Sequence, residues 1–142
     1  MFILTRKILK IPLLGVIGKA FSIISTKKYM QYFTWYIKRL GIKVLGMPKY
    51  IASDVYFDGN NYSKITLGDN ITISREVMLL THDYSITTVF ASIGKRIERG
   101  EGEIYFSNNI TIGNNVFMGA RTSILPNTVI GDNFIIGACS VM

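Results

Sequence analysis

From Ile65 onward, apolar residues recur every six positions, which is neither the 3.6-residue period of a helix nor the two-residue period of a strand. The third position of each six-residue unit is always apolar, and the fourth is glycine in five of nine units. The third-position residues are Leu67, Ile73, Leu79, Phe106, Ile112, Met118, Ile124, Ile130 and Ile136. A six-residue period is typical of a parallel β-helix, in which each unit forms one flat side of a triangular coil. The pattern therefore predicts a mainly β fold.

Three six-residue units make a coil of eighteen residues, and residues 51–64, with Val55 and Phe57, form an irregular opening coil. The expected regular coils are 65–82, 104–121 and 122–139. We expect the third-position side chains to stack inside the solenoid, while Gly or Asn at the turns supplies positive φ at little cost. A β-sandwich is disfavoured because nine units in register would then be a coincidence.

Residues 83–103 interrupt the repeat directly after His82, the single histidine of the chain. Insertions of this length inside a compact domain are usually functional or disordered. His82 ends a six-residue unit, so it is expected at a corner of the solenoid, at the base of the inserted loop. An imidazole there can take a proton from a hydroxyl near neutral pH. A lone histidine is also compatible with a purely structural position.

The N-terminal segment, residues 1–50, is apolar and basic, with stretches compatible with helices. Ten lysines and arginines and no acidic residue fall within residues 1–53, although the whole chain has a net charge of only +7. Lys10 and Lys19 leave no apolar run of roughly 20 residues, so a membrane span is not expected. Lys19 also breaks the apolar run that a signal peptide needs.

Two interpretations of this segment stay open, and they are compatible. Apolar and aromatic residues interleaved with cations are typical of a helix that lies on an anionic membrane, which would give peripheral membrane contact through residues 1–43. The same pattern is typical of a helical cap that packs on the domain and leaves its lysines in solvent. Nucleic acid is not expected as a partner, because no nucleic-acid-binding motif accompanies the charge.

Composition narrows the chemistry further. The chain is 49% hydrophobic, which is enough for one packed domain and argues against wholesale disorder. One cysteine allows no intramolecular disulfide, and one histidine cannot form a multi-histidine zinc site, so no metal is expected.

Three stretches carry a resemblance to a known family: LGDNITIS at 67–74, LLTHDYS at 79–85, and ITIGNNVFMGARTSILPNTVIGDNFIIGACSV at 110–141. They resemble the hexapeptide-repeat acyltransferases, and most of all the branch that contains the maltose and galactoside O-acetyltransferases and the polysaccharide O-acetyltransferases of surface-glycan clusters. The resemblance implies a left-handed β-helix, a homotrimer with active sites between subunits, and acetyl-CoA as the acyl donor.

The resemblance also suggests functions for individual residues. His82 would be the catalytic base that deprotonates an acceptor hydroxyl. Gly119, Ala120 and Ala138 match positions that contact coenzyme A, and Phe117 matches a position at its acetyl end that is often tryptophan. Solenoid geometry alone explains these four equally well.

The remaining candidates concern the acceptor side of the site. Asp58 and Asn60, in the opening coil, are candidates to line the acceptor pocket. Asp83 could orient the imidazole or start the loop, and the loop function is favoured because adjacent side chains seldom pair well.

Relatives continue past this point with a Thr-Lys-Asp-like stretch and often a C-terminal helix, whereas the sequence stops at Met142, inside a unit. The expected β-helix domain, 51–142, is therefore interpreted as truncated, as a fragment, or as covered by oligomer contacts at its end.

The working hypothesis is an O-acetyltransferase that moves an acetyl group from acetyl-CoA to a sugar hydroxyl of a surface-polysaccharide precursor. The basic N-terminus motivates this acceptor, because lipid-carried glycans lie at the membrane face, and acetyl-CoA places the enzyme in the cytoplasm. The alternative is a non-catalytic solenoid that acts as a membrane-associated scaffold.

Overall fold

The computed structural model describes residues 25–59 and 61–142, so residues 1–24 of the basic N-terminal segment and Asn60 lie outside the described residues. The helices are α2 (Thr26–Leu40) and α3 (Ser85–Val89), and the 3₁₀ turns are η1 (Tyr62–Lys64) and η2 (Phe90–Ile93). The strands are β1 (Lys43–Val44), β2 (Tyr50–Ile51), β3 (Tyr56–Phe57), β4 (Ile65–Leu67), β5 (Thr72–Ile73), β6 (Met78–Leu79), β7 (His82–Asp83), β8 (Phe106–Ser107), β9 (Ile110–Ile112), β10 (Phe117–Met118), β11 (Ser123–Ile124), β12 (Val129–Ile130) and β13 (Ile135–Ile136).

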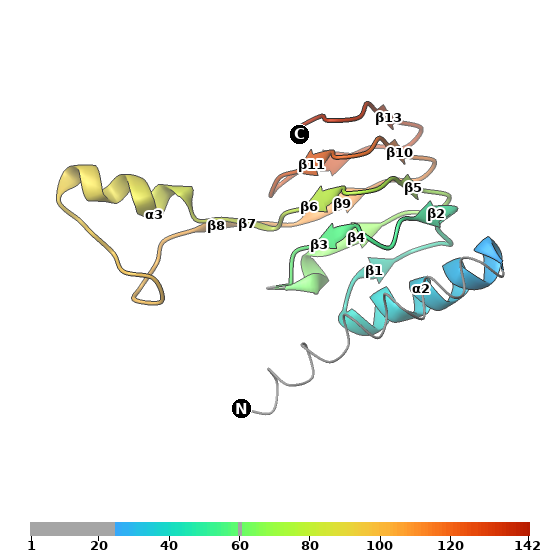
Figure 1. Ribbon diagram of the computed structural model, residues 1–142, viewed down its shortest axis with the longest axis horizontal. Coiled ribbons are helices and arrows are strands. Elements are labelled where there is room, and N and C mark those ends of the chain that lie inside the picture. The colour runs from blue at the N-terminus through green and yellow to red at the C-terminus, as the bar shows by residue number, and fades with distance from the viewer. Residues whose placement is uncertain (1–24, 60) are drawn as a thin grey trace.

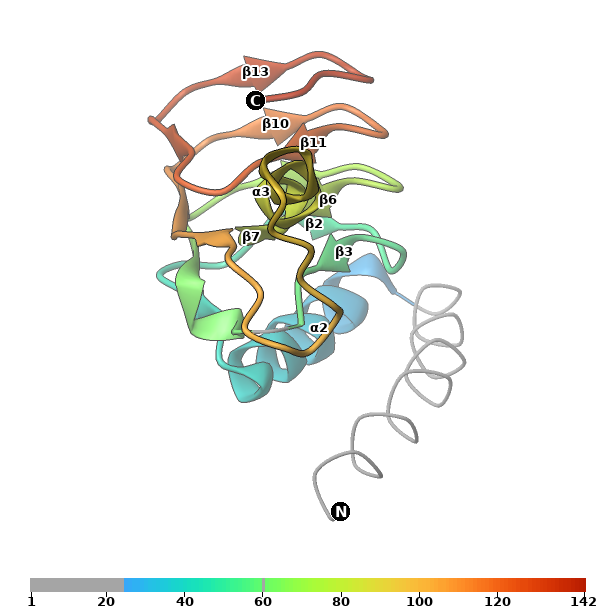
Figure 2. The same cartoon turned by 90° about the vertical axis from the view of Figure 1, so that its left-hand side faces the viewer.

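Short strands stack into a three-sided prism (Figures 1 and 2). Sheet A has the order β1-β4-β9-β12, sheet B the order β13-β10-β5-β2, and sheet C the order β11-β6-β3. Every pairing within these three sheets is parallel. This is the expected mainly β, left-handed β-helix of hexapeptide repeats, with the expected N-terminal helix beside it.

The interior of the prism is filled by the third residue of each unit. Leu67, Ile73 and Leu79 are fully buried, and so are their equivalents one coil later, Met118 and Ile124. Full burial of such a side chain is worth about 1.5–3 kcal/mol. The strands are only two or three residues long, so the stacked apolar rows, together with the ladders, hold the coils in register.

The phase of the second regular coil differs from the expectation. Ile65 pairs with Ile110, not with Ile104, so the unit 104–109 is not a side of the prism. Phe106 lies in β8, which pairs antiparallel with β7, and its side chain is 51% exposed. The expected coils 104–121 and 122–139 therefore begin six residues too early. The segment before residue 110 pairs with β7 in a hairpin and does not return to the prism wall.

Each corner contains two constrained positions of the unit: the sixth has a positive φ, and the fourth lies close to the next coil. The sixth position has a positive φ of 51° to 71° without glycine, at Asn70, Glu76, Asn115, Arg121, Asn127, Asn133 and Cys139. The expectation that glycine supplies this φ was wrong for the fourth position, where glycine instead allows close stacking. A Cβ on Gly68 would lie 2.9 Å from the backbone nitrogen of Asn114 in the next coil.

One corner also carries a ladder of side-chain amides. Asn70 Nδ2 donates to Asn115 Oδ1 at 2.8 Å, and Asn115 Nδ2 donates to Asn133 Oδ1 at 2.9 Å. Asparagine both tolerates the left-handed conformation and bonds to its equivalent in the next coil, which explains its recurrence there.

Helix α2 closes the first coil. Tyr29, Met30 and Ile37 are buried, and the Tyr29 hydroxyl donates to the carbonyl of Ile51 at 2.8 Å. The helical-cap interpretation thus holds for the described part of the segment. The solenoid begins at β1, which pairs with β4, so its first strand precedes the expected boundary at residue 51. No helix among the described residues is long and apolar enough to cross a bilayer.

The insertion forms an arm, defined here as residues 84–105, which projects from one corner of the prism on the β7–β8 pair (Figure 1). Helix α3 and the turn η2 lie on the arm away from the coils (Figure 1). The arm therefore leaves the ladder at His82 without disturbing the stacking of β4 on β9.

Candidate active site

His82 and Asp58 meet at the corner that follows sheet C. The backbone N–H of Asp58 donates to the carbonyl of Leu79 at 3.0 Å, which places the carboxylate directly beneath the residues that follow β6. The Asp58 side chain is 2% exposed and the His82 side chain 23% exposed. Coil stacking thus brings together two residues that are far apart in the sequence.

The Asp58 carboxylate contacts both Thr81 and His82. Its Oδ2 accepts from Thr81 N at 2.9 Å and from Thr81 Oγ1 at 2.8 Å, and it also pairs with Nδ1 of His82. A carboxylate accepts, so Nδ1 carries the hydrogen and Nε2 keeps its lone pair. A buried carboxylate that orients an imidazole in this way leaves Nε2 able to accept a proton from a substrate.

The base of the arm supports this pair. Ser107 lies opposite His82 in the β7–β8 ladder, and its hydroxyl donates to the carbonyl of Thr81 at 3.0 Å. Lys64 Nζ donates to Ser107 Oγ at 2.6 Å. The Tyr84 ring meets the His82 ring edge to face, with centroids 5.0 Å apart. The imidazole is therefore held from below by Asp58 and flanked by the arm.

The structure separates the other acceptor-side candidates. Asp58 lies behind the imidazole as its partner, and its burial leaves it no open pocket surface. Asp83 is exposed and accepts a hydrogen bond from the backbone N–H of Ser85 at 2.7 Å, which lowers the pKa of the Asp83 carboxyl. It thus starts the arm, and the orienting position belongs to Asp58. Asn60 lies outside the described residues.

The four donor-side candidates gather on a different part of the prism. Gly119, Ala120 and Ala138 lie at the corner between sheets B and C, in two stacked coils, where Cys139 N donates to the carbonyl of Ala120 at 2.9 Å. Phe117 precedes them in β10 with its side chain 44% exposed. The width of sheet C separates this corner from His82, so one chain does not bring the two groups together.

The importance of Asp58 as a partner of His82 was missed from the sequence. The two residues are 24 positions apart, and the 3₁₀ turn η1 interrupts the six-residue period between the opening coil and the first regular coil. The pairing of Phe57 with Leu79 places Asp58 beside the residues after β6, and only the stacked coils show this.

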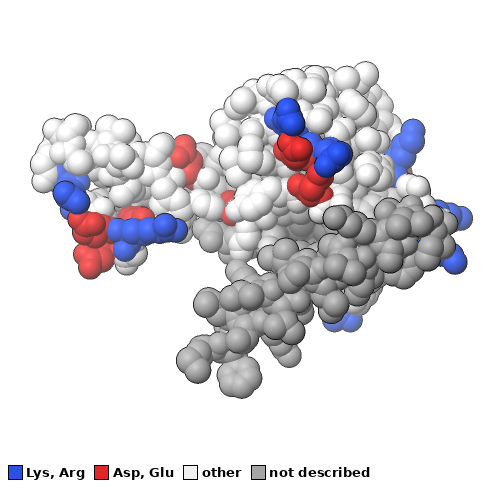
Figure 3. Space-filling view, in the orientation of Figure 1, with Lys and Arg blue, Asp and Glu red and all other residues white. Residues whose placement is uncertain are grey.

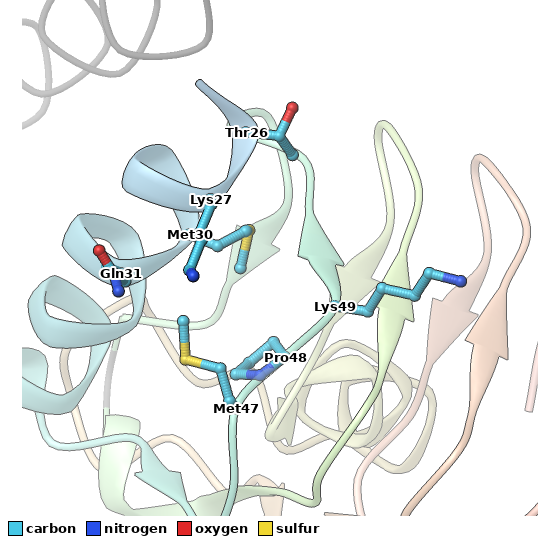
Figure 4. A pocket seen from close by; sticks show the side chains of 7 residues that line it. All are labelled: Thr26, Lys27, Met30, Gln31, Met47, Pro48 and Lys49. Atoms are coloured by element: carbon cyan, nitrogen blue, oxygen red, sulfur yellow. The ribbon is translucent and has the colours of Figure 1, made fainter. Parts of the chain in front are cut away.

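Figure 4 shows a cavity of about 430 Å³ between α2 and the start of the solenoid, near Met30, Met47 and Pro48. Its described lining contains neither His82 nor a donor-side candidate, so it is separate from the site. No group of three or more described histidine, cysteine or acidic residues could hold a metal ion.

Exposed charged side chains pair with one another on the prism and on the arm. Figure 3 shows charged side chains gathered at two places on this face, on the prism and far out on the arm. On the prism, exposed ion pairs join Arg75 to Asp54 at 3.0 Å and Arg121 to Glu76 at 2.8 Å. On the arm, Arg96 pairs with Glu98 at 2.9 Å.

Comparison with known proteins agrees with this geometry. Residues 109–142 match the family described as bacterial transferase hexapeptide (six repeats). The chain is 38% identical over 78 residues to galactoside O-acetyltransferase of Escherichia coli (strain K12), an alignment that covers 55% of this chain and 34% of the relative. The match thus spans about a third of the relative's length. The six-residue ladder, the three-sided parallel β-helix and both similarities show that the chain is similar to the hexapeptide-repeat transferases.

Proposed function

We propose that this chain is an O-acetyltransferase that moves an acetyl group from acetyl-CoA to a sugar hydroxyl, with His82 as the general base. The observation that carries the proposal is the pairing of the partly exposed His82 imidazole with the buried Asp58 carboxylate. The resemblance to galactoside O-acetyltransferase supports the reaction class.

In this mechanism Nε2 of His82 takes the proton of the acceptor hydroxyl as its oxygen attacks the thioester carbonyl. The new C–O bond gives a tetrahedral oxyanion, which collapses with cleavage of the C–S bond. The imidazolium returns its proton to the departing thiolate, so the products are the sugar ester and free coenzyme A. The negatively charged Asp58 stabilises the imidazolium between these steps, and a general base of this kind contributes about 10²–10⁴-fold in rate.

The separation of the two corners supports a site between subunits, and the resemblance to the hexapeptide-repeat acyltransferases supports a homotrimer. Coenzyme A would contact Gly119, Ala120 and Ala138, with Phe117 near the acetyl end, but these residues lie one side of the prism away from His82. A second subunit packed against sheet C would bring its own donor corner to the first subunit's base. The proposed site is therefore formed between chains.

The acceptor we propose is a surface-polysaccharide precursor at the cytoplasmic face of the membrane, contacted through residues 1–43. In the described part of this segment, Lys28, Trp35 and Arg39 share the outer face of α2, and Arg39 lies 5.5 Å from the Trp35 ring centroid. The helix has no acidic residue, and Trp35 is 54% exposed, as expected for contact with anionic lipid. His82 lies in the second coil above α2, two strand spacings or ~10 Å along the solenoid axis.

The reaction is tested by incubating the protein with acetyl-CoA and following free thiol, alone and with a galactoside as acceptor. We expect acceptor-dependent release that falls about 10²–10⁴-fold in His82→Ala and falls strongly in Asp58→Asn. Asp132→Asn is the matched control, since Asp132 lies at the corner between sheets A and B and accepts from Asn114 N at 2.6 Å. Its rate should equal that of the wild type.

Two results would contradict the proposal. Thiol release that survives in His82→Ala would remove His82 as the base. No release, together with no heat of acetyl-CoA binding, would favour the non-catalytic scaffold. Membrane contact is tested separately by sedimentation with anionic vesicles, where Trp35→Ala with Arg39→Ala should lower the bound fraction, and unchanged binding would exclude this face of α2.

A further inference from the structure

Two tyrosine rings form a wall at the base of the arm, beside His82. The centroids of Tyr84 and Tyr105 are 4.6 Å apart and their planes are inclined by 32°. The β7–β8 pairing explains their meeting, because Asp83 lies opposite Phe106 and the next residues along each strand are Tyr84 and Tyr105. The Tyr84 ring stands at 77° to the imidazole. The wall is thus continuous with the base.

This wall is exposed where an aromatic pair would ordinarily be buried. Tyr105 is 49% exposed and Tyr84 is half-buried, and neither belongs to the core of the prism. Aromatic rings dominate cores and binding sites because of the apolar area that they bury. An exposed aromatic surface in contact with a catalytic base therefore points to a ligand that covers it.

The chemistry of a sugar fits this surface. A pyranose ring presents a flat set of C–H bonds on its face and hydroxyl groups around its edge. The C–H face can pack on an aromatic ring, while the edge hydroxyls remain free to meet a base. The Tyr84 ring stands at 77° to the imidazole, so the plane of a sugar packed on Tyr84 would also be steeply inclined to the imidazole plane.

We propose that Tyr84 and Tyr105 form an acceptor subsite on which the ring of a pyranose stacks, with one of its hydroxyls delivered to His82. This inference rests on the proposed function and adds the residues that recognise the acceptor. The competing occupant is the coenzyme A that a second subunit would bring to His82, and this donor needs only its acetyl end near the imidazole. The acceptor hydroxyl, in contrast, must come within hydrogen-bond reach of the imidazole.

The test uses a matched pair at Tyr105, because this residue lies on the arm and outside the ladders. Tyr105→Ala removes the ring, whereas Tyr105→Phe keeps it and removes only the hydroxyl. We expect Tyr105→Ala to raise the KM for the galactoside about three- to tenfold, with the KM for acetyl-CoA unchanged. Tyr105→Phe should stay close to the wild type in both constants.

A binding measurement, which needs no turnover, tests this subsite separately from the catalytic proposal. Saturation-transfer NMR with the galactoside alone should show contact to its ring protons in the wild type and in Tyr105→Phe, and loss of that contact in Tyr105→Ala. His82→Ala should retain the contact, because the wall remains. If no variant or wild-type protein releases thiol but this pattern of contact holds, the proposed reaction fails and the sugar subsite stands.

Other outcomes overturn the subsite. A rise in the KM for acetyl-CoA alone in Tyr105→Ala would mean that the wall holds the donor. Unchanged constants in Tyr105→Ala, with thiol release still lost in His82→Ala, would leave the reaction intact and remove the wall from acceptor binding. A Tyr105→Phe variant as weak as Tyr105→Ala would assign the effect to the hydroxyl, which contradicts ring stacking.

Discussion

A single methyl group at two equivalent glycines tests how tightly the coils stack. Gly119 and Gly131 both occupy the fourth position of a unit, and neither has a positive φ. A Cβ on Gly119 would lie 2.7 Å from the Cα of Ala138, in the backbone of the next coil. A Cβ on Gly131 would meet nothing within 4 Å. Gly119→Ala and Gly131→Ala therefore differ only in whether backbone of the next coil lies against the added methyl group.

The expected magnitudes follow from two opposing effects. Alanine reduces the entropy of the unfolded chain, which stabilises a protein by about 0.4–1 kcal/mol where the native conformation allows it. Overpacking against a backbone that cannot move freely costs about 1–3 kcal/mol. Gly131→Ala should thus raise the free energy of unfolding slightly, and Gly119→Ala should lower it. The difference between the two variants isolates the steric cost.

The assay is urea unfolding followed by far-UV circular dichroism, at one fixed protein concentration because oligomers shift apparent stability. The midpoint of Gly119→Ala should fall and that of Gly131→Ala should rise, with similar m-values. Equal shifts in both variants would refute the reasoning, since the space above Gly119 would then not be closed by Ala138.

Three further predictions concern the core, a corner and the capping helix. Ile112→Ala should lower the free energy of unfolding by about 2–5 kcal/mol in urea titrations, while Val129→Ala, at a side chain that is 75% exposed, should change it by less than about 0.5 kcal/mol. Asn115→Ala should be less stable than Asn115→Gly by roughly 1 kcal/mol, because both lose the amide ladder but only alanine resists a φ of 55°. Burial raises the pKa of the Tyr29 hydroxyl, so stability should be retained below about pH 10 and fall above it, less steeply in Tyr29→Phe when unfolding is measured across pH 8–11.

The repeat predicts most of the prism because its signal is local and redundant. Each third-position residue has the same buried environment, as Leu67, Ile112 and Ile124 show. The assignment of one unit is therefore supported by the pattern of its neighbours. Phe106 was misassigned because the unit 104–109 satisfies the apolar pattern while β8 pairs with β7. A pattern records which side chains are apolar, but not which strand their backbone joins.

The candidate site was only partly predictable for a related reason. His82 was found because it is unique and ends a unit next to an insertion. Its partner Asp58 belongs to the opening coil, whose spacing is irregular, so the contact appears only when the coils are stacked. The distance between His82 and the corner of Ala120 and Ala138 also depends on which sheet each unit joins, which the period alone does not determine.

The parallel pairing of the coils lets the inserted arm change in evolution independently of the coils themselves. Strands β4 and β9 pair residues 45 apart in sequence, whereas β9 and β12 pair residues 18 apart, so the excursion that contains the arm and the β7–β8 pair adds 27 residues between adjacent coils without altering their register. Doubling the length of such an excursion costs only about 0.6 kcal/mol of closure entropy. A different insertion can therefore replace the arm while the coils that carry Asp58 and His82 stay the same. Under the proposed function, a new arm would change the acceptor preference while leaving the stability of the coils unchanged.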